Sequence, residues 1–336
     1  MQILLNIAAS LLPVFIFLAA LIALDTFRLI GLSSVLRSVA IGCLVAVIAY
    51  GVNVLILGAA SWNFTVYTRY AAPVIEECAK AVWLIYLIRS RKIGFPVDAA
   101  IYGFAIGAGF SFVENIYYLN AAGQESILYW LIRGLGTALM HGGTTALLGI
   151  ISMRLSARRS AVRFADVLYG LLVAIAIHSM YNHLFLNPVL STLVMVTVLP
   201  LLILVVFHES EKSTRHWLGI GLDTDLQLLE MINTGNVAET RIGEYFRTLQ
   251  QSFRGEVLAD MLCLIRLHVE LSIRAKGILL MRSAGYEFSL GSDLREKFAE
   301  LKYLERSIGR MGQLAIAPFL YTSSRDLWQI AMLEKS

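Results

Sequence analysis

Charged residues are scarce in this chain of 336 residues: they make up 15% of it, whereas hydrophobic residues make up 57%. Together with a mean hydropathy of +0.69, this excludes an ordinary soluble protein and favours a protein with several membrane spans. The three cysteines are too far apart for a disulfide framework or a zinc knuckle. The net charge is only +4 and is spread over short loops, so nothing indicates a nucleic-acid partner.

The few charges are unevenly distributed along the chain. Residues 1–207 hold 12 Lys/Arg and 7 Asp/Glu, whereas residues 208–336 hold 16 and 17. We therefore predict a transmembrane domain over 1–207 and a soluble helical domain over 208–336. In the second part apolar residues recur at helical spacing. Four glycines are expected to separate its helices: Gly219, Gly221, Gly235 and Gly291.

Seven apolar stretches are long enough to cross a bilayer, which takes roughly 20 residues as a helix. The sequence thus predicts an all-α fold, a polytopic transmembrane helical bundle of about seven spans. The first stretch lacks the basic start of a signal peptide, so it is expected to remain as a span. The predicted spans cover 3–24, 35–58, 66–88, 97–120, 127–152, 164–186 and 189–207.

Basic residues in the connections predict the orientation, because short cytoplasmic loops are enriched in Lys and Arg. Positive charge follows the first, third and fifth spans, and little follows the second, fourth and sixth. We expect a multi-pass protein of the cell membrane with its N-terminus outside and its C-terminal domain in the cytoplasm. The residues behind this expectation are Arg28, Arg37, Arg89, Arg91, Lys92, Arg154, Arg158, Arg159 and Arg163.

The predicted spans nevertheless contain ionisable side chains. Glu76, Glu77 and Lys80 lie near the middle of the third span, where a charged side chain costs roughly 2.5–3.5 kcal/mol on insertion scales. Two adjacent carboxylates at low dielectric need a compensating cation. Lys80 lies one helical turn from both glutamates and can pair with them. Ionisable groups inside a span usually mark function.

Three further spans supply polar side chains at a similar depth. Counting about 1.5 Å per residue places them all between the outer interface and the middle of the membrane. Small residues at four-residue spacing in the fourth span, from Ala99 to Gly107, would let its neighbours approach closely. We therefore predict that these spans share one site with the third. Their polar residues are Glu114, His141, His178 and Asn182.

Hydrolysis is the chemistry that suits this set of side chains. A carboxylate can remove a proton from water. A second acid, an imidazole or an amide can then stabilise the oxyanion and protonate the leaving amine. No Ser, Cys or Thr nucleophile stands out, and the HExxH motif of metalloproteases does not occur.

Four motifs follow one another on successive predicted spans: Glu76-Glu77-x-x-Lys80, Phe110-x-x-x-Glu114-Asn115, His141 and His178-x-x-x-Asn182. In this order they resemble the motifs of the PrsW-type intramembrane proteases. This family is related to the CPBP group, which contains CAAX prenyl proteases and abortive-infection proteins. The resemblance covers about residues 60–190.

The resemblance implies an endopeptidase that hydrolyses a membrane-anchored protein inside the lipid bilayer. Characterised relatives make the first cut in a membrane-bound anti-sigma factor, on the extracytoplasmic side. By resemblance, Glu76 or Glu77 would activate the attacking water. The residues that would orient water, hold the oxyanion or complete the polar shell are His141, His178, Asn182, Glu114 and Asn115.

The resemblance leaves the cofactor open. Such families are described both as metal-independent glutamic enzymes and as metalloproteases. Glu and His are good ligands for a divalent metal such as zinc. If a metal is required, the residues expected to hold it are Glu76, Glu77, Glu114, His141 and His178.

Two other functions are compatible with the same residues. Intramembrane Glu, Lys and His also build the proton relays of transporters, although no internal repeat of the transporter kind is found. A non-catalytic protein that binds a membrane partner is the third interpretation. The C-terminal domain is expected to recruit a cytoplasmic partner, gate the membrane site or support an oligomer.

Each polar residue also has a structural interpretation, as a buried ion pair, a helix cap or an interhelical hydrogen bond. Arg69 and Arg133 are expected to extend outward to the membrane surface; for Arg133 the alternative is an approach to the site.

Overall fold

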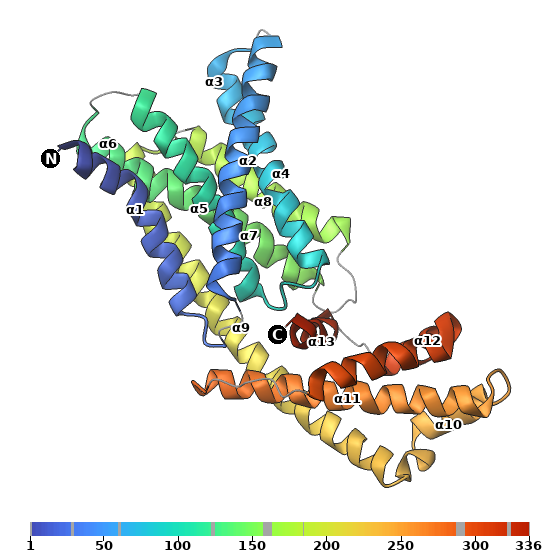
Figure 1. Ribbon diagram of the computed structural model, residues 1–336. Coiled ribbons are helices and arrows are strands. Elements are labelled where there is room, and N and C mark those ends of the chain that lie inside the picture. The colour runs from blue at the N-terminus through green and yellow to red at the C-terminus, as the bar shows by residue number, and fades with distance from the viewer. Residues whose placement is uncertain are drawn as a thin grey trace. The chain divides into compact units, whose positions relative to one another are not determined.

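The computed structural model describes residues 2–27, 30–59, 62–121, 125–156, 163–183, 185–286, 293–320 and 324–335. Every regular element in these ranges is a helix, which confirms the predicted all-α class (Figure 1). The chain divides into two compact units, an N-terminal unit of Met1–Ser156 with Ala161–Glu211 and a C-terminal unit of Lys212–Ser336. Among the residues used above, four lie outside the described ranges: Arg28, Arg158, Arg159 and Gly291.

The N-terminal unit is a helical bundle. Six of its helices, with α6, η2 and α7 taken as one, are long and apolar enough to cross a membrane. Two short segments, η1 and η2, are π-helical. The elements are α1 (Gln2–Ala23), α2 (Leu32–Ala59), α3 (Phe64–Val66), η1 (Tyr67–Ala71), α4 (Ala72–Arg89), α5 (Pro96–Ala121), α6 (Ile127–Leu131), η2 (Ile132–Thr137), α7 (Ala138–Ser156), α8 (Phe164–Asn182) and the first part of α9 (Pro188–Asn233).

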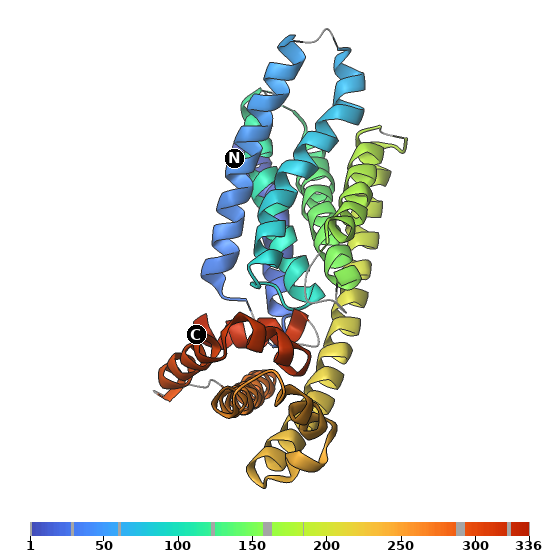
Figure 2. The ribbon, with the colours of Figure 1, turned by 90° about the vertical axis from the view of Figure 1, so that its right-hand side faces the viewer.

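The predicted third span differs from the other six. It is helical from Phe64 to Arg89, but it is not among the helices apolar enough to cross a membrane on composition alone. The cause is its charge, since Glu76, Glu77 and Lys80 lie in its middle. Figure 2 shows α4 running beside α2 within the bundle. Packing against neighbouring helices therefore supplies the partners that this segment needs.

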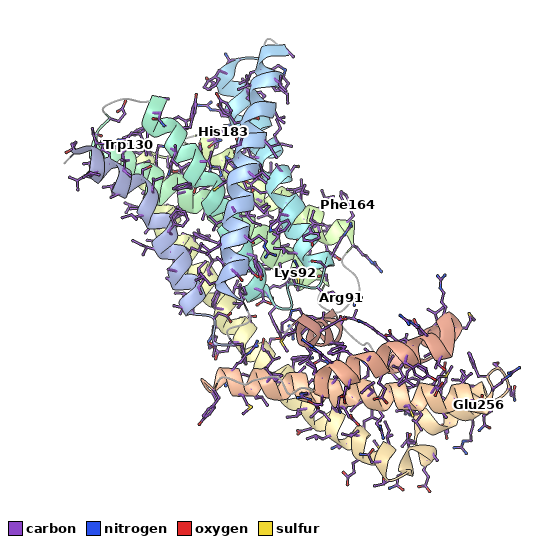
Figure 3. All side chains as sticks on the ribbon, viewed as in Figure 1. Arg91, Lys92, Trp130, Phe164, His183 and Glu256 are labelled. Atoms are coloured by element: carbon purple, nitrogen blue, oxygen red, sulfur yellow. The ribbon has the colours of Figure 1, made fainter. Side chains whose placement is uncertain are left out.

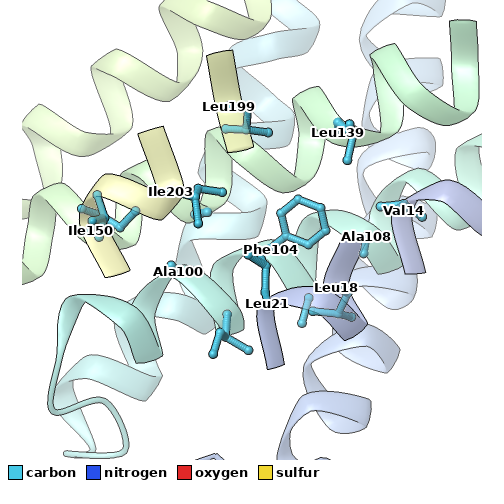
Figure 4. Packing of buried hydrophobic residues seen from close by; sticks show 14 of the residues in the cluster. Val14, Leu18, Leu21, Ala100, Phe104, Ala108, Leu139, Ile150, Leu199 and Ile203 are labelled. Atoms are coloured by element: carbon cyan, nitrogen blue, oxygen red, sulfur yellow. The ribbon is translucent and has the colours of Figure 1, made fainter. Parts of the chain in front are cut away.

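Helix α5 forms the centre of the bundle. Sixteen of its 26 residues are buried, and it packs against α1, α2, α4 and α7. Around Phe104, Figure 4 shows side chains of other helices, including Leu18 of α1, Leu139 of α7 and Leu199 of α9. A helix that is apolar on all sides is expected in such a central position.

Glycines bring α5 close to its neighbours. A Cβ added at Gly107 would lie 2.2 Å from the backbone oxygen of His141 on α7. One added at Gly103 would lie 2.5 Å from the backbone oxygen of Thr145, and one at Gly109 would lie 2.0 Å from that of Val39 on α2. Only residues without a side chain fit at these crossings, so the prediction that small residues allow close approach is confirmed.

The end of α4 has an unusual backbone. Arg91 adopts a left-handed conformation, with φ of 55°. The backbone N–H groups of Arg91 and Lys92 donate to the carbonyl oxygens of Ile88 and Leu87, at 3.1 and 2.9 Å. This is a left-handed helix cap of the kind usually made by glycine. It places Arg91 and Lys92 together just beyond the helix (Figure 3).

The C-terminal unit is built from amphipathic helices around its own core. Leu264, Ile265 and Leu301 belong to this core. The prediction that Gly219 and Gly221 end helices is wrong, because both lie inside α9; Gly235, with φ of 77°, follows the end of α9. The remaining elements are η3 (Asn236–Glu239), α10 (Arg241–Leu249), α11 (Gly255–Ser283), α12 (Asp293–Leu320) and α13 (Ser324–Lys335).

The crossing of α5 and α7 yields a first prediction. Gly107→Ala should lower the stability of the protein by about 1–3 kcal/mol, because the added methyl group collides with backbone that cannot move away. Thermal unfolding in detergent measures the effect. Gly51→Ala is the matched control, since nothing lies within 4 Å of its added Cβ. Equal stability of the two variants would show that α5 and α7 can move apart at this crossing without a loss of stability.

Candidate active site

A fully buried ion pair lies at the centre of the bundle. The Lys80 ammonium is 2.7 Å from Oε1 of Glu77, and both side chains are 0% exposed. The two residues are three apart on α4, so the helix itself holds them on one face. The ammonium also lies 4.3 Å from the centroid of the Phe110 ring. A buried pair of this kind is stable only when further hydrogen bonds satisfy both charges.

Glu77 receives those hydrogen bonds from two other helices. Its Oε1 atom is 2.8 Å from Nδ1 of His178 on α8 and 3.3 Å from the hydroxyl of Thr144 on α7. A carboxylate accepts, so Nδ1 of His178 carries the proton. Nε2 of His178 lies 3.8 Å from Oε2 of Glu76, and in a neutral imidazole it is the acceptor nitrogen.

His141 on α7 joins the ion pair to Glu114 on α5. Its Nδ1 lies 2.9 Å from the Lys80 ammonium, and its Nε2 lies 2.8 Å from Oε2 of Glu114. An ammonium only donates, so Nδ1 accepts and Nε2–H donates to Glu114. The ring of His141 also lies 4.8 Å from that of His178, centroid to centroid. Predicted site residues from four separate helices therefore meet here: Lys80, Glu114, His141 and His178.

Arg133 is also part of this cluster. Its guanidinium is 3.2 Å from Oε1 of Glu114 and lies 3.7 Å from the centroid of the Tyr118 ring. Its Nε donates to Oδ1 of Asn115 at 3.0 Å, and Nδ2 of Asn115 donates to the carbonyl of Ser10 at 2.9 Å. Of the two predictions for Arg133, extension to the membrane surface is wrong and approach to the site is confirmed, because Glu114 and Asn115 offer it partners inside the bundle.

Glu76 faces a cavity. The cavity has a volume of about 400 Å³, is bounded by α2, α4 and α5 together with η1, and has both Glu76 and Glu114 in its wall. Nδ2 of Asn53 donates to Oε1 of Glu76 at 3.3 Å, and the Tyr67 hydroxyl donates to Oδ1 of Asn53 at 2.8 Å. The wall is otherwise mostly apolar and aromatic, as is typical of pockets that take an organic substrate.

Asn182 is not hydrogen-bonded to the cluster. Its Nδ2 donates to the carbonyl oxygen of Thr68 in η1 at 3.0 Å. One turn earlier on α8, the Ser179 hydroxyl donates to the carbonyl of Arg69 at 2.6 Å. Asn182 therefore fixes η1 to α8, next to the helix that carries Glu76 and Glu77.

The two π-helical segments immediately precede the helices that carry the cluster. Tyr67 lies in η1 before α4, and Arg133 lies in η2 before α7. A π-helical turn accommodates an extra residue and changes the direction of the side chains around it, and such turns are frequent at functional sites. Both segments direct a side chain toward the residues described above.

The donor atoms of Glu76, His141 and His178 suit a metal ion. One ligand atom from each lies within 4.8 Å of the others. Two imidazoles and one carboxylate form a known protein ligand set of catalytic zinc. Nδ1–H of His178 donates to Glu77, and metal-bound histidines usually donate their other ring N–H to a carboxylate in this way. The residues present therefore fit a divalent metal, for which His141 would give up its bond to Lys80 or to Glu114.

Comparison with known proteins agrees with this geometry. Residues 31–207 match the model of the PrsW family intramembrane metalloproteases. The chain belongs to this family. No curated protein and no solved structure matched it.

Membership of the PrsW family makes this protein a multi-pass membrane peptidase that acts on a membrane protein in a lipid environment. The transporter and the non-catalytic partner-binding protein are alternatives that this membership does not support. All four motifs of the predicted resemblance lie within the matched residues.

Three residues that contact the site are not among the predicted site residues: Asn53, Tyr67 and Thr144. Asn53 does leave a signal, since it is a strongly polar residue inside a predicted apolar span. Tyr67 leaves no specific signal, since an aromatic residue near the end of a predicted span is equally expected at the membrane interface. Nothing in the sequence around Thr144 distinguishes it from a packing residue.

The Asn53 contact yields a second prediction. Asn53→Leu removes the hydrogen bond to Glu76 and leaves the Tyr67 hydroxyl without its acceptor. A hydrogen bond to a charged group is worth about 1.5–3 kcal/mol, so the rate of cleavage of a membrane-anchored reporter should fall about tenfold or more. Asn120→Leu is the control, because Asn120 is exposed and bonds only to its own helix. Normal cleavage by Asn53→Leu would mean that Glu76 does not need this contact.

Proposed function

We propose that this PrsW family peptidase hydrolyses a peptide bond of a membrane-anchored protein, with Glu76 as the carboxylate that acts on the attacking water. Anti-sigma-factor-like regulators are the substrate class that the family resemblance suggests. The observation that carries the proposal is the contrast between the two adjacent glutamates. Glu76 faces the cavity, whereas Glu77 is fully buried and bonded to three side chains.

Each side chain has its own role in the hydrolysis. Glu76 takes a proton from water as the water attacks the scissile carbonyl, and then passes this proton to the leaving amine. Glu77 holds Nδ1–H of His178, so that Nε2 of His178 is directed toward Glu76. The positive charges of Lys80 and Arg133 favour the negative charge that develops on the carbonyl oxygen.

Charge supports a divalent metal in this site. Three carboxylates, Glu76, Glu77 and Glu114, face two cations, Lys80 and Arg133, which leaves one net negative charge when the histidines are neutral. Glu76, His141 and His178 would hold the metal, for which zinc is our candidate. Bound there, the metal supplies Lewis-acid activation of water and of the scissile carbonyl. Glu76 would then hold the metal through one carboxylate oxygen and accept the proton of water with the other.

The position of the site supports cleavage toward the outer half of the bilayer. Glu76 precedes Arg89, at the basic end of α4, by 13 residues, or about 20 Å of helix. Arg91 and Lys92 follow the end of α4, and Arg154 lies in the last turn of α7. Basic residues at helix ends favour the cytoplasmic side. We propose that the N-terminus lies outside and that the C-terminal unit is cytoplasmic.

Replacement of the two glutamates should have different effects. Glu76→Gln should fold and lose about 10²–10⁴-fold in the cleavage rate, because it loses its proton acceptor. Glu77→Gln should instead reduce stability by about 3–5 kcal/mol, because it leaves the buried Lys80 unpaired. Cleavage of a membrane-anchored reporter and thermal unfolding in detergent measure the two effects.

Glu125→Gln serves as the control for both variants, since Glu125 is exposed and lies outside the helices. A folded Glu76→Gln protein that cleaves the reporter at the normal rate would disprove the proposed role of Glu76.

Metal analysis tests the ligand assignment. Purified protein should contain about one zinc ion per chain, and His178→Ala should lose it. Binding should weaken at low pH, because ligating imidazoles must be unprotonated. Removal of the metal should stop cleavage, and added zinc should restore it. Full activity of metal-free protein would instead make this a glutamic peptidase.

A further inference from the structure

The C-terminal unit contains a second cavity that the peptidase chemistry does not use. It has a volume of about 500 Å³ and lies among the C-terminal half of α9, α11 and the two last helices. This volume is typical of small-molecule sites. Its wall combines apolar residues such as Phe319 with buried polar ones such as Lys276 and Gln329. The core of the same unit is otherwise formed mainly by Leu, Ile and Val.

The polar side chains form one network. The Lys276 ammonium lies 2.5 Å from Oδ2 of Asp225 and 3.0 Å from the hydroxyl of Ser272. The Ser272 hydroxyl donates to Asp225 at 2.5 Å and accepts from Nε2 of Gln329 at 2.8 Å. Residues of α9, α11 and α13 thus meet at the Ser272 hydroxyl, which has no capacity left for another partner.

Two hydrogen-bonding positions of this network have no partner in the part of the chain that the structure describes. Gln329 is 3% exposed, and its Oε1 atom has no hydrogen-bond partner among the described residues. A buried acceptor without a partner costs about 1–3 kcal/mol. An ammonium has three N–H groups, and the two contacts of Lys276 with Asp225 and Ser272 account for two of them. The wall therefore offers an acceptor and a donor, both adjacent to Ser272.

The space around Lys276 depends on a glycine. A Cβ added at Gly221 would lie 2.9 Å from the Lys276 ammonium. The absence of a side chain at this point in α9 lets the ammonium reach Asp225 one turn further along. The ammonium also lies 5.4 Å from the centroid of the Trp217 ring, so an aromatic surface adjoins the same donor.

The charges that line the cavity balance. Lys276 and Arg325 are matched by Asp225 and Asp326. Burial lowers the pKa of His268 to about 4, so this ring adds no charge near neutral pH. A ligand that suits this wall is neutral, has an apolar face and presents an N–H group beside a carbonyl oxygen.

We propose that this cavity binds a nucleoside whose base carries an N–H group next to a carbonyl, as in uridine and guanosine. The base N–H donates to Oε1 of Gln329, and the base carbonyl accepts from the Lys276 ammonium. This ligand satisfies both unused positions at once. The site is separate from the peptidase residues, all of which belong to the N-terminal unit.

Calorimetric titration of the full-length protein in detergent tests the site. Uridine or guanosine should bind with a dissociation constant of about 1 mM or lower. Uridine methylated at the base N–H should bind at least about tenfold more weakly, because the donor to Gln329 is gone. This ligand pair needs no change in the protein, so misfolding cannot explain the difference.

A matched pair of variants completes the test. Gln329→Leu should weaken nucleoside binding about tenfold, and Gln313→Leu should leave it unchanged because Gln313 is exposed on α12. Both variants should still cleave a membrane-anchored reporter. Absence of uridine and guanosine binding to folded wild-type protein would overturn the proposal. Equal binding of the methylated nucleoside would overturn it too.

Discussion

The buried ion pair of Lys80 and Glu77 is the interaction on which the rest of the active site depends. Both side chains are excluded from solvent, so neither charge is tolerable without the other and without further hydrogen bonds. Those bonds come from His141 and Thr144 on α7 and from His178 on α8. The pair therefore joins three helices at one point. The same contacts stabilise the ion pair and determine which nitrogen of each neutral imidazole carries its proton.

Helix packing and site geometry are coupled through α5. Its glycines let backbones touch, and Gly107 faces the carbonyl of His141 itself. The distance between α5 and α7 thus also sets the separation of Glu114 and His141, which bond at 2.8 Å. The π-helical segments η1 and η2 also shape the site, because they direct Tyr67 and Arg133 toward it. Small residues and irregular turns thus bring the polar side chains of this apolar bundle within hydrogen-bonding distance of one another.

The C-terminal unit is stabilised by a different kind of interaction. Its helices are amphipathic and bury leucine and isoleucine against one another, as in soluble proteins. Against this background the network of Lys276, Asp225 and Ser272 is costly, since buried polar groups must be fully paired to be neutral in free energy. A cavity wall with unused hydrogen-bonding positions is easier to explain by a ligand than by the packing of helices alone.

The sequence by itself determined the all-α class, the membrane-spanning character of most of the first 207 residues and the set of motifs that meet in the site. These properties are local, since hydropathy and the spacing of Glu76, Glu77 and Lys80 act along one helix. Only the tertiary structure decided that Glu76 faces a cavity while Glu77 is buried, that Arg133 turns inward and that Asn182 bonds to η1. It also showed that α9 continues through Gly219 and Gly221. Contacts such as Lys80 with His141 and Glu77 with His178 join residues 61 and 101 positions apart. They depend on the rotation and crossing of whole helices, which local periodicity does not encode.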